Sequence, residues 1–152
     1  MAANTSNANL FISIHHNGGG GGDGYEVYNF TGSLKGSLIA ELIAEEFDAL
    51  GQNKRYVGSG LYAGTQKGDY YVLKHTNCPA ALGEFGFMDT KDYTQFDELL
   101  ELIDIGKAYG RAVLRYFEIE IKPEPDEEPL AKIVEVIADL EQTIKELKML
   151  LK

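Results

Sequence analysis

Several residue types are scarce in this 152-residue chain, and each scarcity excludes a class of protein. Cys78 is the only cysteine, so no disulfide can form within the chain. Only 14 basic residues stand against 24 acidic ones, and a net charge of -10 argues against nucleic acid as a partner. No apolar run approaches the roughly 18 residues of a transmembrane helix, which argues against a membrane as partner. The N-terminus shows no signal-peptide pattern, so we expect cytoplasmic synthesis.

The residues that are present suffice for one globular domain and an appendage. Hydrophobic residues make up 44% of the chain, which is enough for a core. Three of the four prolines and four acidic residues fall within 122–129, a composition that stops a helix and keeps the chain extended. We therefore expect a domain at 1–121, a linker at 122–129 and a separate helix at 130–152.

Two short apolar segments are each predicted to form a strand that carries, towards its C-terminal end, a side chain that can take part in hydrolysis. Residues 11–17 carry His15, and residues 79–87 carry Glu84. A neutral imidazole can hold a metal ion and a carboxylate can activate water, which is what a metal-assisted hydrolase needs. His16 directly follows His15 and should therefore point to the opposite face of a strand.

The other patterns predict alternating strands and helices, with apolar residues on both faces of the first strand. The predicted strands lie at 10–15, 24–30 and 69–73, and the predicted helices at 33–50 and 92–117, the latter with a break near 91–95. We therefore expect an α/β fold with a mostly parallel central sheet flanked by helices.

Three polar residues are further candidates for contact with the site or its substrate: Asn17, Glu26 and His75. Glu26 lies on the strand predicted at 24–30, where a carboxylate on a solvated edge is the more ordinary interpretation. His75 follows the strand predicted at 69–73 in a polar turn, where a histidine is commonly solvated.

The two apolar segments resemble the zinc-dependent N-acetylmuramoyl-L-alanine amidases of bacteria and their phages, a family often called amidase type 3. That family carries a strand of the form hydrophobic-Ser-Ile-His-x-Asn, which is similar to residues 11–17. It also carries a later strand of the form Pro-Ala-x-Leu-x-Glu-x-Gly-Phe, which is similar to residues 79–87. The resemblance covers roughly residues 2–117.

This resemblance implies a peptidoglycan hydrolase of the endolysin or autolysin kind, cleaving the amide bond between N-acetylmuramic acid and L-alanine. It implies Zn2+ as cofactor, His15 as a zinc ligand and Glu84 as the general base. It also implies action on the cell wall, after release as in phage lysis, or by secretion if a preceding segment carries a signal.

Two features of the family do not occur in this chain. One is a strand ending in Gly-His-Gly-Gly, which supplies the first zinc ligand, and the other is a later Glu that supplies the second. The chain therefore resembles an amidase domain without its first strand region, and His15 alone does not complete a site with three protein ligands. The alternative is a non-catalytic truncated relative that binds peptidoglycan or assembles with a full-length subunit.

Apolar residues recur at intervals of three and four from Leu130 to Leu151, which is a heptad pattern. Isoleucine at the central a positions and leucine at d favours two parallel strands, although trimers and four-helix arrangements fit as well. An amphipathic helix folded back on its own domain is the other interpretation. We predict a coiled-coil-like helix that makes the protein a homo-oligomer.

Overall fold

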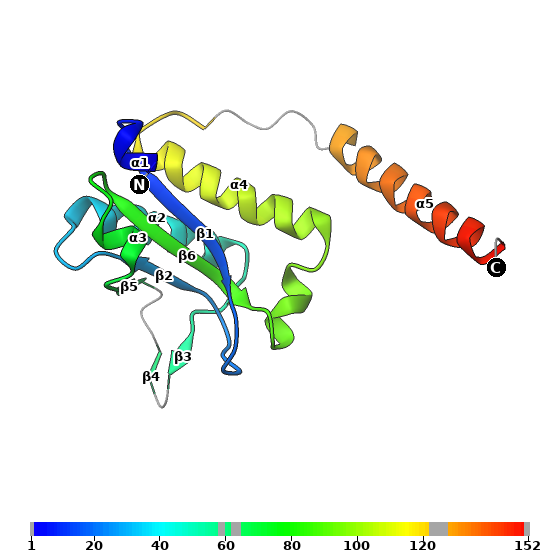
Figure 1. The fold of residues 1–152 in the computed structure, drawn as a ribbon, viewed down its shortest axis with the longest axis horizontal. Helices are drawn as coiled ribbons and strands as arrows, with labels where there is room; N and C mark the ends of the chain where they lie inside the picture. Colours follow the sequence, from blue (N-terminus) through cyan, green and yellow to red (C-terminus); the bar gives the residue numbers. More distant parts are fainter. Residues whose placement is uncertain (1, 58–59, 62–64, 122–127, 151–152) are drawn as a thin grey trace. The chain divides into compact units, whose positions relative to one another are not determined.

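The computed structural model describes residues 2–57, 60–61, 65–121 and 128–150, and Figure 1 shows their elements. The chain divides into two compact units, residues 1–121 and residues 122–152. Among the described helices, none is long and apolar enough to cross a membrane. The linker predicted at 122–129 lies almost wholly outside the described residues.

A four-stranded sheet forms the centre of the first unit (Figure 1). Its strands lie in the order β1 (Phe11–Asn17), β6 (Ala80–Phe87), β2 (Glu26–Asn29) and β5 (Thr65–Lys67). The pairs β1–β6 and β2–β5 are parallel and the pair β2–β6 is antiparallel, so the sheet is mixed. A second pair, β3 (Tyr56–Val57) with β4 (Gly60–Leu61), lies outside this sheet.

Two long helices cover one face of the sheet, namely α2 (Leu34–Ala49) and α4 (Leu99–Tyr116). The Ser33 side chain caps α2 by accepting a hydrogen bond from the Gly36 N–H, as is usual for serine at this position. A 3-10 helix, η1 (Lys91–Gln95), precedes α4. The helix predicted at 33–50 and the break predicted near 91–95 are both confirmed, and this α/β arrangement encloses the main core.

The opposite face is covered only in part, by the short helix α3 (Tyr71–Lys74). Leu73 of α3 packs on Ala80 and Leu82, near the beginning of β6. The prediction of a strand at 69–73 is therefore wrong, since residues 71–74 form α3. The N–H groups of Leu73 and Lys74 both donate to the Tyr70 carbonyl, which closes a helical turn instead.

Among the described strands, β1 lies at the edge of the sheet and has β6 as its one neighbour. Ile14 is 58% exposed, so the expectation of a first strand buried on both faces is wrong. The short helix α1 (Ala2–Thr5) precedes β1, and Asn4 from α1 donates a hydrogen bond to the His75 carbonyl.

The described residues of the second unit form the helix α5 (Glu128–Leu150). The apolar side chains at its a and d heptad positions are exposed within that unit: Ile133, Ile137, Leu140, Ile144 and Leu147. An amphipathic helix with an uncovered apolar stripe is typical of a surface that packs against another element.

Candidate active site

Three side chains singled out from the sequence lie in one row across the sheet. His15 on β1 is in register with Glu84 on β6, and Glu84 is in register with Glu26 on β2. Partners in register on neighbouring strands project from the same face. This is the face that α3 covers only near the start of β6, so no described helix lies over the row.

Glu84 is the central member of the row and is half-buried. Its Oε2 atom is buried and has no hydrogen-bond partner among the described residues. Burial raises the pKa of this carboxyl to about 7, and the neighbouring negative charge of Glu26 adds to the effect. A carboxyl with a pKa near neutrality can both take up and return a proton at physiological pH.

Glu26 is only 3% exposed, so the expectation that it lies on a solvated edge is wrong. The reason is that β5 pairs along the outer side of β2 and makes it an interior strand. Arg55 Nη1 lies 2.7 Å from Glu26 Oε1, and the Asn17 amide donates to Glu26 Oε2 at 2.6 Å. The structure therefore brings Asn17 and Glu26 together beside Glu84.

The three histidines occupy different places. His15 is exposed, and its Nε2 lies 2.8 Å from Ser13 Oγ. His16 points to the other face, as predicted, where its ring stacks on Phe96 with centroids 4.1 Å apart. Burial is the main cause of a lowered pKa of His16, and the charge of the neighbouring His15 lowers it further.

His75 does not lie beside the row. It follows α3 and precedes β6, whereas Glu84 lies towards the end of β6. Its ring stacks on Tyr71 with centroids 4.1 Å apart, and its carbonyl accepts a hydrogen bond from Asn4 at 2.8 Å. These contacts place it where β6 begins rather than where the row lies.

The row offers few donor atoms to a zinc ion, which binds three protein ligands in a catalytic site. Within the described part of the chain, no three His, Cys, Asp or Glu side chains gather closely enough to hold a metal. His15 offers one imidazole and Glu84 one unpartnered oxygen, while both oxygens of Glu26 are already bonded. The described residues by themselves therefore do not fit a zinc site with three protein ligands.

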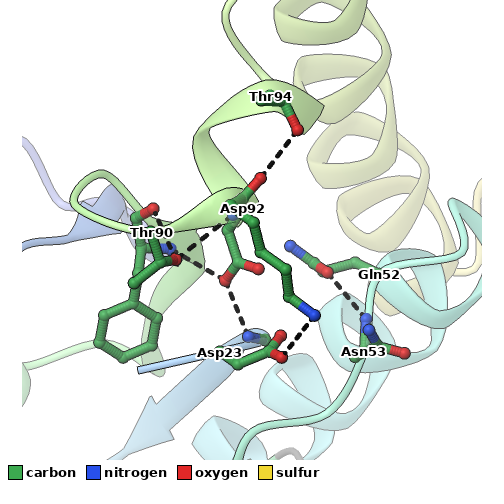
Figure 2. A network of polar contacts seen from close by, with 9 residues as sticks. Asp23, Gln52, Asn53, Thr90, Asp92 and Thr94 are labelled. Carbon is green, nitrogen blue, oxygen red and sulfur yellow. Dashed lines mark hydrogen bonds and ion pairs between the residues drawn. The ribbon is translucent and has the colours of Figure 1, made fainter. Parts of the chain in front are cut away.

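A buried polar network, which the sequence did not single out, holds the strand ends that carry the row (Figure 2). Asp92 of η1 is fully buried, and its Oδ2 accepts hydrogen bonds from the Gly24 N–H at 2.8 Å and the Phe87 N–H at 3.2 Å. It thereby joins the start of β2 to the end of β6. Gly24 has φ +87, and a Cβ there would lie 2.4 Å from the Asn53 carbonyl oxygen, so only glycine fits.

The five glycines at 18–22 connect β1 to β2 beside this network. Gly21 donates its N–H to Asp89 Oδ2 at 3.3 Å. Gly22 lies against the Phe87 ring, because a Cβ at this position would come within 2.3 Å of that ring. The glycine run thus lets backbone pack directly on the end of β6.

An α/β sheet that holds a proton-accepting carboxyl next to an imidazole is typical of a hydrolase site. The sequence model of the family described as N-acetylmuramoyl-L-alanine amidase matches residues 1–113, and the chain belongs to this family. The resemblance read from the two strand motifs is thereby confirmed. The chain spans only about two fifths of the length of the curated relatives that it matches.

Two relatives and one solved structure illustrate the similarity. An endolysin of Bacillus phage SPP1 is 33% identical over 114 residues, which are 72% of this chain and 41% of the endolysin. The N-acetylmuramoyl-L-alanine amidase CwlM of Bacillus licheniformis is 29% identical over 120 residues, which are 78% of this chain and 44% of that protein. The crystal structure of the amidase Ami1 from Mycobacterium smegmatis has a TM-score of 0.68 at 22% identity, covering 76% of this chain and 56% of that chain, which shows the fold.

Proposed function

We propose that this protein is a peptidoglycan hydrolase that cleaves the amide bond between N-acetylmuramic acid and L-alanine. Its family membership and its endolysin and amidase relatives support this function, and they also support action on the cell wall. The observation that carries the proposal is Glu84, whose buried Oε2 has no hydrogen-bond partner among the described residues and whose pKa is raised to about 7.

We assign proton transfer to Glu84. In the ionised state it accepts a proton from the attacking water as the new C–O bond forms at the scissile carbonyl. It then donates that proton to the alanine nitrogen as the C–N bond breaks, so the carboxylate is regenerated. Arg55 and Asn17 bind both oxygens of Glu26 and hold its carboxyl group in place beside Glu84.

Family membership implies zinc, which when bound would polarise the scissile carbonyl and acidify a bound water. We propose that His15 is one ligand of that ion, because it is the imidazole in the row and is exposed on the open face. The described residues do not provide the other ligands.

The proposal is tested by measuring zinc per chain and release of L-alanine from N-acetylmuramoyl-L-alanine. We expect Glu84→Gln to retain zinc and to lose about 10²–10⁴-fold in rate, the usual contribution of a general base. His15→Ala should lose the zinc. His16→Ala is the matched control, because its imidazole faces the other side of β1.

A wild-type chain that binds zinc and releases no alanine would contradict the amidase function. Equal rates in the wild type and in Glu84→Gln would contradict the role of Glu84 while leaving the amidase function intact. Zinc retained in His15→Ala would contradict the assignment of His15 as a ligand.

We further propose that α5 joins copies of this chain into a homo-oligomer as a coiled coil, with residues 122–127 linking it to the domain at 1–121. The exposed apolar residues at a and d support this proposal. Leu140→Asp should lower the mass measured by sedimentation equilibrium. Gln142→Asp, at an f position on the polar side of the heptad, should leave it unchanged, and an unchanged mass in Leu140→Asp would contradict the proposal.

A further inference from the structure

A guanidinium group lies at the end of the row opposite His15. Arg55 Nη1 is 2.7 Å from Glu26 Oε1, and Arg55 Cζ lies 4.9 Å from the centroid of the Phe87 ring. Its side chain is 31% exposed, whereas that of Glu26 is 4% exposed. Arg55 is thus fixed by an ion pair and by an aromatic face, and it still reaches solvent.

The guanidinium has more donors than these contacts use. It offers five N–H groups in a planar fork suited to carboxylates, and in the described part of the chain only Nη1 makes a side-chain hydrogen bond. Glu26 takes one of these N–H groups, at its Oε1, and its Oε2 accepts from Asn17. Arg55 therefore keeps Nε and Nη2 for a second acceptor.

The charges around the row determine how an anionic acceptor could bind there. Glu26 and Glu84 would both repel an anion, and the neighbouring Lys54 is held by Asp48 of α2 at 3.1 Å. Arg55 is the described cation in contact with the row. Arg55 is therefore the described side chain that can pair with an anionic group at this end of the row.

The spacing of the row defines where on the substrate that anion lies. Neighbouring strands are about 4.8 Å apart, and Arg55 reaches Glu26 from the side of β2 away from β6, so Arg55 lies more than one strand spacing from Glu84. An extended peptide covers about 3.3–3.6 Å per residue. The distance corresponds to roughly two residues from the amide bond next to Glu84.

We propose that Arg55 binds a carboxylate on the peptide side of the scissile bond, about two residues from it, and so selects substrates with an anionic peptide. This inference rests on the proposed function, because it concerns the same site. Arg55 is thus a residue for substrate specificity, and proton transfer remains with Glu84.

The test compares N-acetylmuramoyl-L-alanyl-glycine with its C-terminal carboxamide. Binding is measured by calorimetry in a Glu84→Gln background, which prevents cleavage. We expect about tenfold tighter binding of the acid, the size of one charged hydrogen bond. Adding Arg55→Gln should weaken binding of the acid about tenfold and leave binding of the carboxamide unchanged.

Two further variants make this comparison decisive. Lys54→Gln removes the same charge one residue away and should keep the preference for the acid. Arg55→Gln alone leaves Glu26 buried without its partner, so Glu26→Gln combined with Arg55→Gln provides a neutral pair if the single variant fails to fold. The combined variant should also bind the acid and the carboxamide equally.

Equal weakening of both ligands by Arg55→Gln would overturn the inference, as would loss of the preference in Lys54→Gln. Cleavage of the carboxamide by the wild-type chain tests the proposed function separately. Cleavage without an Arg55-dependent preference refutes only the inference, whereas an intact preference without cleavage refutes only the proposed function.

Discussion

Replacing Glu84 by glutamine should make the protein more stable at high pH. The pKa of Glu84 rises from an ordinary 4.5 to about 7 in the folded chain, chiefly through burial. The folded chain therefore binds this proton more tightly than the unfolded chain does. As a consequence, ionisation of Glu84 destabilises the fold increasingly between pH 4.5 and about 7, and the full cost is present above pH 7.

The size of this effect follows from the difference between the two pKa values. Each pKa unit corresponds to about 1.4 kcal/mol, which sets an upper limit of about 3 kcal/mol. Glu84 is half-buried and water screens part of its charge, so we expect about 1–2 kcal/mol. For a domain of this size, that difference raises the melting temperature by about 3–6 °C.

The assay is thermal unfolding of both proteins at pH 5 and pH 8 in the presence of a chelator. The difference in unfolding free energy between Glu84→Gln and the wild type should be larger at pH 8 than at pH 5 by about 1–2 kcal/mol. Glu120→Gln removes an exposed carboxylate of the same kind and serves as the control for net charge. A difference between Glu84→Gln and the wild type that is the same at both pH values would refute the reasoning.

Three further substitutions test the packing around the site by urea unfolding. Asp92→Ala should cost about 2–4 kcal/mol, because it leaves the Gly24 N–H and a second buried N–H unpaired, and a cost below 1 kcal/mol would contradict this role. Gly24→Ala should cost more than Gly20→Ala. Both glycines have positive φ, but only at Gly24 would the new Cβ clash, so equal costs would contradict the clash. Tyr109→Phe should cost about 1 kcal/mol, since its hydroxyl donates to the buried Gly83 carbonyl at 3.0 Å, and no loss would show that this bond contributes nothing.

The sequence predicted most reliably the elements whose signals are local. The helix at 33–50 shows the apolar period and a serine at its start, and α2 is found with Ser33 as its cap. The prediction of a strand at 69–73 was wrong because the local signal there is ambiguous. A short apolar run fits a strand or a buried helical turn equally well, and only the contact of Leu73 with β6 decides between them.

The surroundings of Glu26 depended on contacts that no local pattern shows. The strand that pairs with its outer side, β5 (Thr65–Lys67), consists of Thr, Gln and Lys within a polar loop and has no apolar alternation. Arg55 comes from the same region of the chain and was not singled out either. Asp92 was taken as the start of a helix, although its carboxylate binds the N–H groups of two distant segments.

The sequence by itself determined the family, the two strands that carry His15 and Glu84, and the main helices, because each of these depends on residues close together in the chain. Tertiary structure alone decided that β1 is an edge strand, that Glu26 is buried beside Glu84, and that Arg55 lies at the end of their row. Strand order and direction bring these residues together across the sheet. The pKa of Glu84 is raised by burial and by the nearby negative charge of Glu26. Both the burial and the closeness of Glu26 arise only when the chain folds.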